Sequence, residues 1–118
     1  RLDKINMNRN EKAHIFRKIL KNENIHLIKH KKGAVYWRQN AIVSKYRDKL
    51  LKYLIYKKVY ARKYFPSLNS VFPFISGKNL KLVKKFELEI LNFWVGSQTS
   101  KKDIIQINKH INNFFISL

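Results

Sequence analysis

Tyrosine and lysine side chains recur at helical spacing between residues 45 and 64, where neither glycine nor proline interrupts the sequence. The tyrosines of this row lie seven residues apart, at Tyr46, Tyr53 and Tyr60. Cations form two rows beside them, the first at Lys45, Lys49 and Lys52 and the second at Lys58 and Arg62. A cationic row beside an aromatic row binds phosphates and stacks on unpaired bases, as RNA-binding surfaces do. The alternative interpretation places the tyrosine rings in the core and gives the lysines only a solubilising role.

The charge of the whole chain points to the same kind of partner. Its 118 residues include 26 Lys and Arg but only 7 Asp and Glu, which gives a formal net charge of +19. A compact domain with this charge repels itself, and nucleic acid relieves that repulsion while releasing its own counterions. We therefore expect basic side chains along the first half of the chain to contact RNA phosphates. The expected RNA-binding residues are Arg9, Arg17, Lys18, Lys29, Lys31, Lys32, Arg38, Lys45, Tyr46, Arg47, Lys49, Lys52, Lys58 and Arg62.

Few residues offer catalytic or metal-binding chemistry. His26 and His30 lie four residues apart, but no third ligand stands at a recognised zinc spacing and the chain has no Cys. Glu87 and Glu89 would point to different sides of a helix, so they do not make an acid–base pair. Ser97 has no nearby His and Asp to activate it. The sequence predicts a protein that is not an enzyme and has no cofactor, no metal and no small-molecule substrate.

The elements that would position the basic side chains are expected to be helical. We predict an all-α fold with a long basic central helix, an extended N-terminal segment and a small C-terminal helical core. The predicted segments are a basic N-terminal extension over 1–33 with a short helix over 10–22, a helical domain over 34–118 with a long helix over 34–65, a loop over 66–78, and helices over 79–95 and 100–116. A helix of some 30 residues would be about 45 Å long and would outrun its own core, as happens where RNA completes that core.

The segment from Ile25 to Ile28 stays open to a second interpretation, as a short strand. The last helix has the clearest signal, because Ser100 precedes Asp103 by three residues, as in a capping box. Apolar residues then follow at three- and four-residue intervals, at Ile104, Ile107, Ile111, Phe114 and Leu118. Its polar face carries mostly Asn and Gln, which favours a core helix over a membrane-surface helix. No apolar run reaches the ~18 residues of a membrane span.

The chain resembles an organellar ribosomal protein, and within that class the bacterial-type large-subunit ribosomal protein twenty family. The residues that carry the resemblance are Gly33 with Val35-Tyr36, Ala41-Ile42-Val43, Tyr46-Arg47-Asp48, Phe74-Ile75 with Gly77, and Glu87-Leu88. The resemblance implies a basic N-terminal half that threads large-subunit rRNA and a C-terminal helical knob on the surface. It also implies that Tyr46 and Arg47 face rRNA, and that Asp48 orients Arg47 or a neighbouring Lys.

The predicted function is that of a structural constituent of a ribosome, which binds rRNA and neighbouring ribosomal proteins and supports assembly. Residues with A/T-rich codons dominate the composition, including 20 Lys, 14 Ile and 12 Asn. This bias predicts a mitochondrial location, or alternatively another organelle or the cytoplasm of an AT-rich organism. Two other functions remain open at this point: a protein–protein scaffold in an organellar complex, and a basic DNA-binding protein that uses the helix pair after residue 79.

Overall fold

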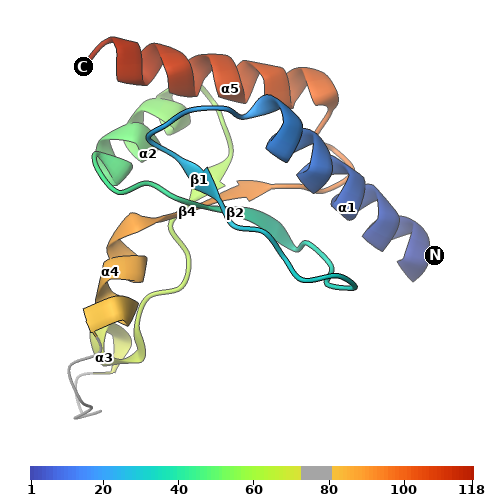
Figure 1. Ribbon diagram of the computed structural model, residues 1–118, viewed down its shortest axis with the longest axis horizontal. Helices are drawn as coiled ribbons and strands as arrows, with labels where there is room; N and C mark the ends of the chain where they lie inside the picture. The colour runs from blue at the N-terminus through green and yellow to red at the C-terminus, as the bar shows by residue number, and fades with distance from the viewer. Residues whose placement is uncertain (73–80) are drawn as a thin grey trace.

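The computed structural model describes residues 1–72 and 81–118, and it combines helices with an antiparallel sheet. The elements are α1 (Leu2–Ile19), β1 (His26–Leu27), β2 (Arg38–Ile42), α2 (Arg47–Tyr56), β3 (Ala61–Arg62), α3 (Leu68–Val71), α4 (Lys81–Glu89), β4 (Ile90–Trp94) and α5 (Lys101–Ile116). Helices α1, α2 and α5 lie on one side of the sheet, and α3 and α4 project from the body on the other side (Figure 1). No helix in these two described stretches is both long and apolar enough to cross a membrane.

The strand order in the sheet is β1-β2-β4-β3, and each neighbouring pair is antiparallel. Strands β2 and β4 pair along their whole lengths, with Arg38 opposite Trp94 and Ile42 opposite Ile90. The short β3 adds Ala61 opposite Phe93. Because these central strands are far apart in the sequence, the sheet brings residues near 38, 62 and 94 together.

One face of the sheet packs against α1, α2 and α5 and forms the core. Side chains alternate between the faces of a strand, so every second residue of β2 and β4 points to these helices. The sheet residues of this core include Ala41, Val43, Leu91, Phe93 and Val95, and the helices add Ala13, Phe16, Leu50, Leu54, Ile104 and Ile111. The rings of Phe16 and Phe93 stack with their centroids 5.5 Å apart. Burial of each such ring stabilises the fold by roughly 1.5–3 kcal/mol.

Helix α5 begins as the sequence predicts. The Ser100 hydroxyl accepts a hydrogen bond from the Asp103 backbone N–H at 3.1 Å, and the Asp103 carboxylate accepts one from the Ser100 N–H at 2.7 Å. This reciprocal pair is a complete capping box. The predicted helix over 100–116 is therefore confirmed, and its buried face consists of Ile104, Ile107, Ile111 and Phe114.

The prediction of an all-α fold is wrong, and the long helix over 34–65 is its largest error. That stretch contains β2, α2 and β3. Three non-glycine residues of this stretch lie in the left-handed region: Tyr46 with φ 63° before α2, Lys58 with φ 60° after it, and Phe65 with φ 74° after β3. Such a conformation costs a residue with a side chain roughly 1–2 kcal/mol, and glycine usually occupies it. Because these positions carry other residues, the sequence gives no signal that the helix is interrupted there.

The predicted helix over 79–95 is also only partly present. Helix α4 ends at Glu89, and the chain continues directly as the buried strand β4. The predicted N-terminal extension is not extended, because α1 covers 18 residues and supplies Ala13 and Phe16 to the core. The strand interpretation of residues 25–28 is supported by β1. The start of the predicted 79–95 helix, the second half of the 66–78 loop, and Phe74, Ile75 and Gly77 lie outside the described residues.

Candidate functional site

Arg38 lies on the sheet face that points away from α1, α2 and α5, and only 6% of it is exposed. Its guanidinium carbon lies close to four aromatic rings. The distances to the ring centroids are 4.7 Å for Trp37, 4.7 Å for Tyr64, 5.1 Å for Trp94 and 5.6 Å for Tyr60. We call these four rings with Arg38 the arginine cluster. Aromatic faces attract a cation, and each such contact contributes roughly 0.5–2 kcal/mol depending on how far the charge is desolvated.

The Arg38 guanidinium is not fully hydrogen-bonded. Its Nε and Nη1 atoms are buried, and neither has a hydrogen-bond partner among the described residues. Arginine stays protonated in proteins, so Arg38 holds a full positive charge at this place. Buried charges are ordinarily paired. Among the described residues Arg38 pairs with no carboxylate, and its neighbours are the four rings together with the Tyr60 hydroxyl, to which it donates a hydrogen bond.

A second arginine adjoins the arginine cluster through Tyr60. The guanidinium carbon of Arg62 lies 4.8 Å from the Tyr60 ring centroid, so two cations contact one ring. A hydrogen bond from Arg38 lowers the pKa of the Tyr60 phenol, with further lowering from a hydrogen bond that Tyr64 donates and from the charges of Arg38 and Arg62. The lowered pKa therefore reflects chiefly the donors that meet the Tyr60 oxygen.

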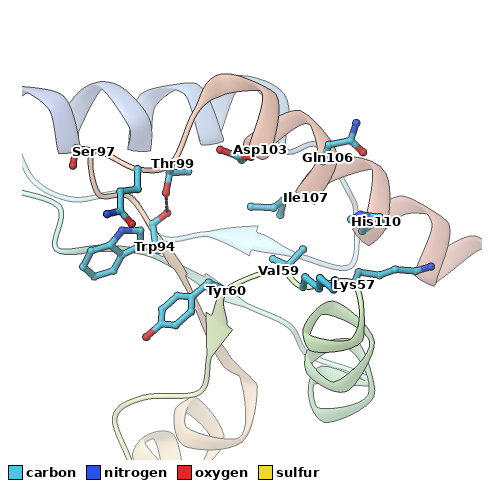
Figure 2. A pocket seen from close by; sticks show the side chains of 12 residues that line it. Lys57, Val59, Tyr60, Trp94, Ser97, Thr99, Asp103, Gln106, Ile107 and His110 are labelled. Carbon is cyan, nitrogen blue, oxygen red and sulfur yellow. Dashed lines mark hydrogen bonds between the residues drawn. The ribbon is translucent and has the colours of Figure 1, made fainter.

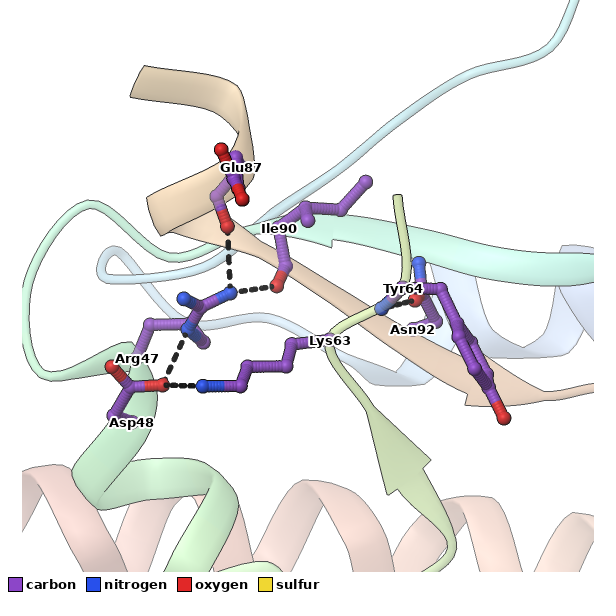
Figure 3. Close-up of polar contacts among 7 residues, drawn as sticks. All are labelled: Arg47, Asp48, Lys63, Tyr64, Glu87, Ile90 and Asn92. Carbon is purple, nitrogen blue, oxygen red and sulfur yellow. Dashed lines mark hydrogen bonds and ion pairs between the residues drawn. The ribbon is translucent and has the colours of Figure 1, made fainter. Parts of the chain in front are cut away.

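Two asparagines on the same sheet face fix the segment that carries Tyr64. The fully buried Asn92 donates from Nδ2 to Asn40 Oδ1 at 2.8 Å. Its own Oδ1 accepts a hydrogen bond from the backbone N–H of Tyr64 at 2.9 Å (Figure 3). This bond ties the chain after β3 to β4. The Tyr64 ring is thereby held over Arg38.

A cavity of about 770 Å³ adjoins the arginine cluster. Its lining residues come from the α2–β3 connection, the β4–α5 connection and α5, and they are Lys57, Lys58, Val59, Tyr60, Trp94, Ser97, Gln98, Thr99, Asp103, Gln106, Ile107 and His110. Figure 2 shows Trp94 and Tyr60 side by side at one end of the cavity, with Lys57 and His110 at the other. Trp94 and Tyr60 belong to both features, so the cavity borders the arginine cluster, while Arg38 itself does not line it. The volume lies within the range of roughly 300–1,000 Å³ that is common for small-molecule sites.

The polar groups of this cavity include both donors and acceptors. Burial lowers the pKa of His110, and the charges of Lys57 and Lys109 lower it further, so the neutral imidazole is favoured. Hydrogen bonds from Ser100 lower the pKa of Asp103, which keeps its carboxylate ionised at neutral pH. Gly96 lies directly beneath the indole of Trp94: a Cβ atom at Gly96 would meet Trp94 Nε1 at 2.3 Å. Only glycine leaves room for the indole in this position.

Arg47 is as buried as Arg38 but has a different role. Its Nη1 donates to the backbone carbonyls of Glu87 at 3.0 Å and Ile90 at 2.7 Å, and its Nε lies 3.0 Å from Asp48 Oδ1 (Figure 3). Asp48 also pairs with Lys63 at 3.4 Å. Arg47 therefore joins the first turn of α2 to the junction of α4 and β4. The ribosomal resemblance implied that Arg47 faces rRNA, but Arg47 is buried and points into the fold.

The structure disperses most of the other predicted binding residues. Arg9, Arg17 and Lys18 lie on α1, while Lys29, Lys31 and Lys32 lie in the β1–β2 connection. Arg17 hydrogen-bonds the Tyr36 hydroxyl. The lysine row is broken because Lys45 precedes α2, which carries only Lys49 and Lys52. Lys58 lies in a turn and Arg62 in β3. Of the predicted set, the fold brings together Arg38 and Arg62, which are 24 positions apart.

The tyrosine row is broken as well. Tyr46 precedes α2 in the left-handed region and contacts the Lys49 ammonium, which lies 5.5 Å from its ring centroid. Tyr53 packs against Phe114 of α5, as the core alternative proposed. Sequence analysis did not identify Trp37, Asn40, Asn92 and Trp94 as site residues. The adjacency of Trp37 and Arg38 was the only local signal, because the other contacts depend on strand pairing.

No group of three His, Asp or Glu side chains in the described part of the chain lies close enough together to hold a metal ion. Comparison of the sequence with protein-family models and with curated proteins finds no match. Comparison of the fold with solved structures finds strong similarities. The aminotransferase TlmJ from Streptoalloteichus hindustanus superposes with a TM-score of 0.88 at 16% identity over 99% of this chain and 33% of its own.

Two further solved structures show the same likeness. DesI, crystallised in the presence of its TDP-sugar product, has a TM-score of 0.84 at 14% identity over 94% of this chain and 31% of its own. A Bacillus cereus protein assigned as a PLP-dependent aminotransferase has a TM-score of 0.79 at 18% identity over 91% of this chain and 32% of its own. The chain thus has the fold of a part of these proteins and spans about a third of their length.

These similarities overturn the functional predictions made from the sequence. The resemblance to ribosomal protein twenty is wrong, because the chain has the fold of a part of several aminotransferases. The predictions of a ribosomal structural constituent, of a protein that is not an enzyme, and of rRNA and ribosomal proteins as partners are contradicted by the same finding. The scaffold and DNA-binding alternatives fall with them. The large positive charge attracts anions of any kind and does not identify a polymer as the partner.

Proposed function

We propose that this chain forms one part of a PLP-dependent aminotransferase that transfers an amino group to a sugar substrate. The observation that carries the proposal is the agreement of nearly the whole chain with aminotransferases at TM-scores up to 0.88, among them DesI with its TDP-sugar product at 0.84. The two-faced sheet supports it. One face builds the core, and the other presents polar and aromatic groups next to a cavity that has the volume of a small-molecule site.

The described residues do not hold PLP by themselves. PLP enzymes bind the cofactor as a Schiff base with a lysine and place a charged partner at its ring nitrogen. Every lysine in the described stretches is exposed except Lys12, which is half-buried on α1. An exposed lysine lacks the enclosed site in which such a bond persists. In this proposal the described residues therefore contribute walls of a substrate site, and the cofactor lysine lies elsewhere in the protein.

The experiment uses the protein purified from cells that express it, so that any residues beyond these 118 are present. The protein is incubated with PLP, an amino-acid donor and nucleotide-linked keto sugars. We expect the absorbance of bound PLP, and we expect the amine nitrogen of an isotopically labelled donor in the sugar product. A parallel reaction without the donor controls for amine carried by the protein. Absence of both bound PLP and labelled amino sugar contradicts the proposal.

A further inference from the structure

We propose that Arg38 and Arg62, with the Tyr60 ring between them, form a binding site for an oxyanion of a small ligand, either a carboxylate or a phosphate. We infer that the ligand is a substrate of the aminotransferase, and this part of the inference rests on the proposed function. Anion binding itself is argued from the described side chains alone.

The first argument is the uncompensated charge of Arg38. Only 6% of Arg38 is exposed, and its buried Nε and Nη1 atoms have no hydrogen-bond partner in the described part of the chain. Transfer of a charge out of water is costly, and the four surrounding rings return only part of that cost. An oxyanion at the guanidinium supplies charge and hydrogen-bond acceptors together, which is the arrangement in which buried arginines are ordinarily found.

The second argument is that no carboxylate of the described chain fills this role. The side-chain ion pairs among the described residues are those of Asp48 with Arg47 and with Lys63. Arg62 donates from Nη1 to the Ala61 carbonyl at 3.1 Å and is otherwise exposed. Both guanidinium groups thus retain donors and positive charge for an anion that comes from outside these residues.

The third argument is the order that the rings impose. Trp37, Tyr64 and Trp94 hold the Arg38 guanidinium plane, and Asn92 fixes the backbone of Tyr64. A planar guanidinium held in one orientation recognises the planar edge of a carboxylate or two oxygens of a phosphate. A flexible lysine at this position would attract an anion without that geometry.

The fourth argument is the adjoining cavity. Tyr60 contacts both arginines and also lines the 770 Å³ cavity, whose far end carries Lys57. An anionic group at Arg38 would leave the uncharged part of its ligand at the aromatic wall of Tyr60 and Trp94. Hydroxyl and amide groups of Ser97 and Gln106 line the same cavity. The site therefore fits a sugar-sized or nucleotide-sized ligand with one oxyanion at its end.

The test is calorimetric titration of the full 118-residue chain with inorganic phosphate, thymidine diphosphate and glutarate. Tryptophan fluorescence in the same titrations reports the location of binding, because both tryptophans of the chain contact Arg38. Because the chain has a net charge of +19, anions also bind weakly over its whole surface. Lys102→Gln on α5 is the matched control, since it removes one exposed charge outside the arginine cluster and the cavity.

We expect Arg38→Met to weaken binding by roughly tenfold to hundredfold, the usual range for loss of a charged hydrogen-bond donor. Arg38→Lys keeps the charge, and we expect it to weaken binding nearly as much because it loses the planar donor set. Arg62→Gln changes an exposed side chain, so we expect it to fold as the parent does, which circular dichroism checks, and to weaken binding by about threefold to tenfold. Lys102→Gln is expected to leave both the affinity and the fluorescence change within about twofold.

Several outcomes separate this site from the proposed function. Equal affinities for the parent, both Arg38 variants and Arg62→Gln overturn the oxyanion site, as does binding without any tryptophan signal. Arginine-dependent anion binding in a protein that transfers no amine supports the site and contradicts the aminotransferase proposal. Amine transfer with unchanged KM for both substrates in Arg38→Lys supports the function and overturns the site. Arginine-dependent binding of phosphate and thymidine diphosphate alone identifies a phosphate ligand, and such binding of glutarate alone identifies a carboxylate.

Discussion

Arg38 and Arg47 are buried to the same extent, with 6% and 5% exposed, yet their surroundings differ in kind. Arg47 meets two backbone carbonyls and a carboxylate. Arg38 meets four aromatic rings, and within residues 1–72 and 81–118 two of its nitrogens have no hydrogen-bond partner. A buried cation that donates to backbone carbonyls is part of the architecture, because its removal leaves those carbonyls unpaired. This holds for Arg47 although its Nε, like two nitrogens of Arg38, has no hydrogen-bond partner among the described residues. A buried cation that meets no such carbonyls contributes little to the fold and is available to a ligand.

The largest expected loss of stability tests whether Arg47 holds the fold together. Arg47→Met should lower the free energy of unfolding by about 3 kcal/mol, because the carbonyls of Glu87 and Ile90 lose their donor inside the fold. Urea unfolding followed by circular dichroism measures the loss. Lys45→Met, which removes an exposed charge two residues earlier, is the control. A loss below about 1 kcal/mol would show that the junction of α4 and β4 does not depend on Arg47.

The second prediction concerns the cap of α5, a part of the fold that the sequence predicted. The loss of stability in its variant is a reference for the losses in the Arg47 and Arg38 variants. Ser100→Ala removes the hydroxyl that caps α5 and should cost about 1 kcal/mol. Ser97→Ala changes an exposed serine in the preceding loop and serves as the matched control. The same urea titration compares the two. Equal stabilities for both variants would mean that the first turn of α5 does not need its cap.

A smaller effect sharpens the account of Arg47. Asp48→Asn should cost about 0.5 kcal/mol, because 60% of the Asp48 side chain is exposed and solvent screens its pairing with Arg47 and Lys63. The cost should shrink further in high salt. Measurement of unfolding at low and high salt checks both statements. If Asp48→Asn were as harmful as Arg47→Met, the carboxylate rather than the carbonyls would be what holds Arg47.

The smallest expected change in stability belongs to the other arginine. Arg38→Met should alter the free energy of unfolding by less than about 1 kcal/mol, because an apolar side chain fills the space among the rings without a desolvated charge. Arg47→Met is the direct reference for this variant in the same unfolding experiment. A loss comparable to that of Arg47→Met would remove the distinction between the two arginines and make the arginine cluster a structural unit.

The parts of this structure that follow local rules were predictable from the sequence. Helix α5 shows its cap at Ser100 and Asp103 and its buried stripe in the spacing of its isoleucines. The strands were missed because β2 carries polar residues on both faces, Arg38 and Asn40 on one and the fully buried Gln39 on the other, which leaves no clean alternation of apolar and polar residues. In β4, Ile90 and Trp94 continue the four-residue spacing of α4 and so extended the predicted helix beyond Glu89.

The candidate site was less predictable than the fold, for a physical reason. Arg38 and Arg62 were singled out for their charge, but their neighbours are set by pairing of β2 with β4 and of β3 with β4. Nothing near Arg38 in the sequence indicates that Trp94 lies opposite it. Arg47 was assigned to a surface because charge alone does not reveal the carbonyls of Glu87 and Ile90 40 and 43 positions away.

Gly96 gives the sheet end one further property. Because the indole of Trp94 occupies the space that a side chain at position 96 would need, a single added methyl group would act as a wedge beneath the ring. The wedge would displace one wall of the cavity and one of the faces that hold Arg38 in a single step. A substitution at Gly96 would therefore change which molecules fit at this end of the sheet, although Gly96 itself would not contact them.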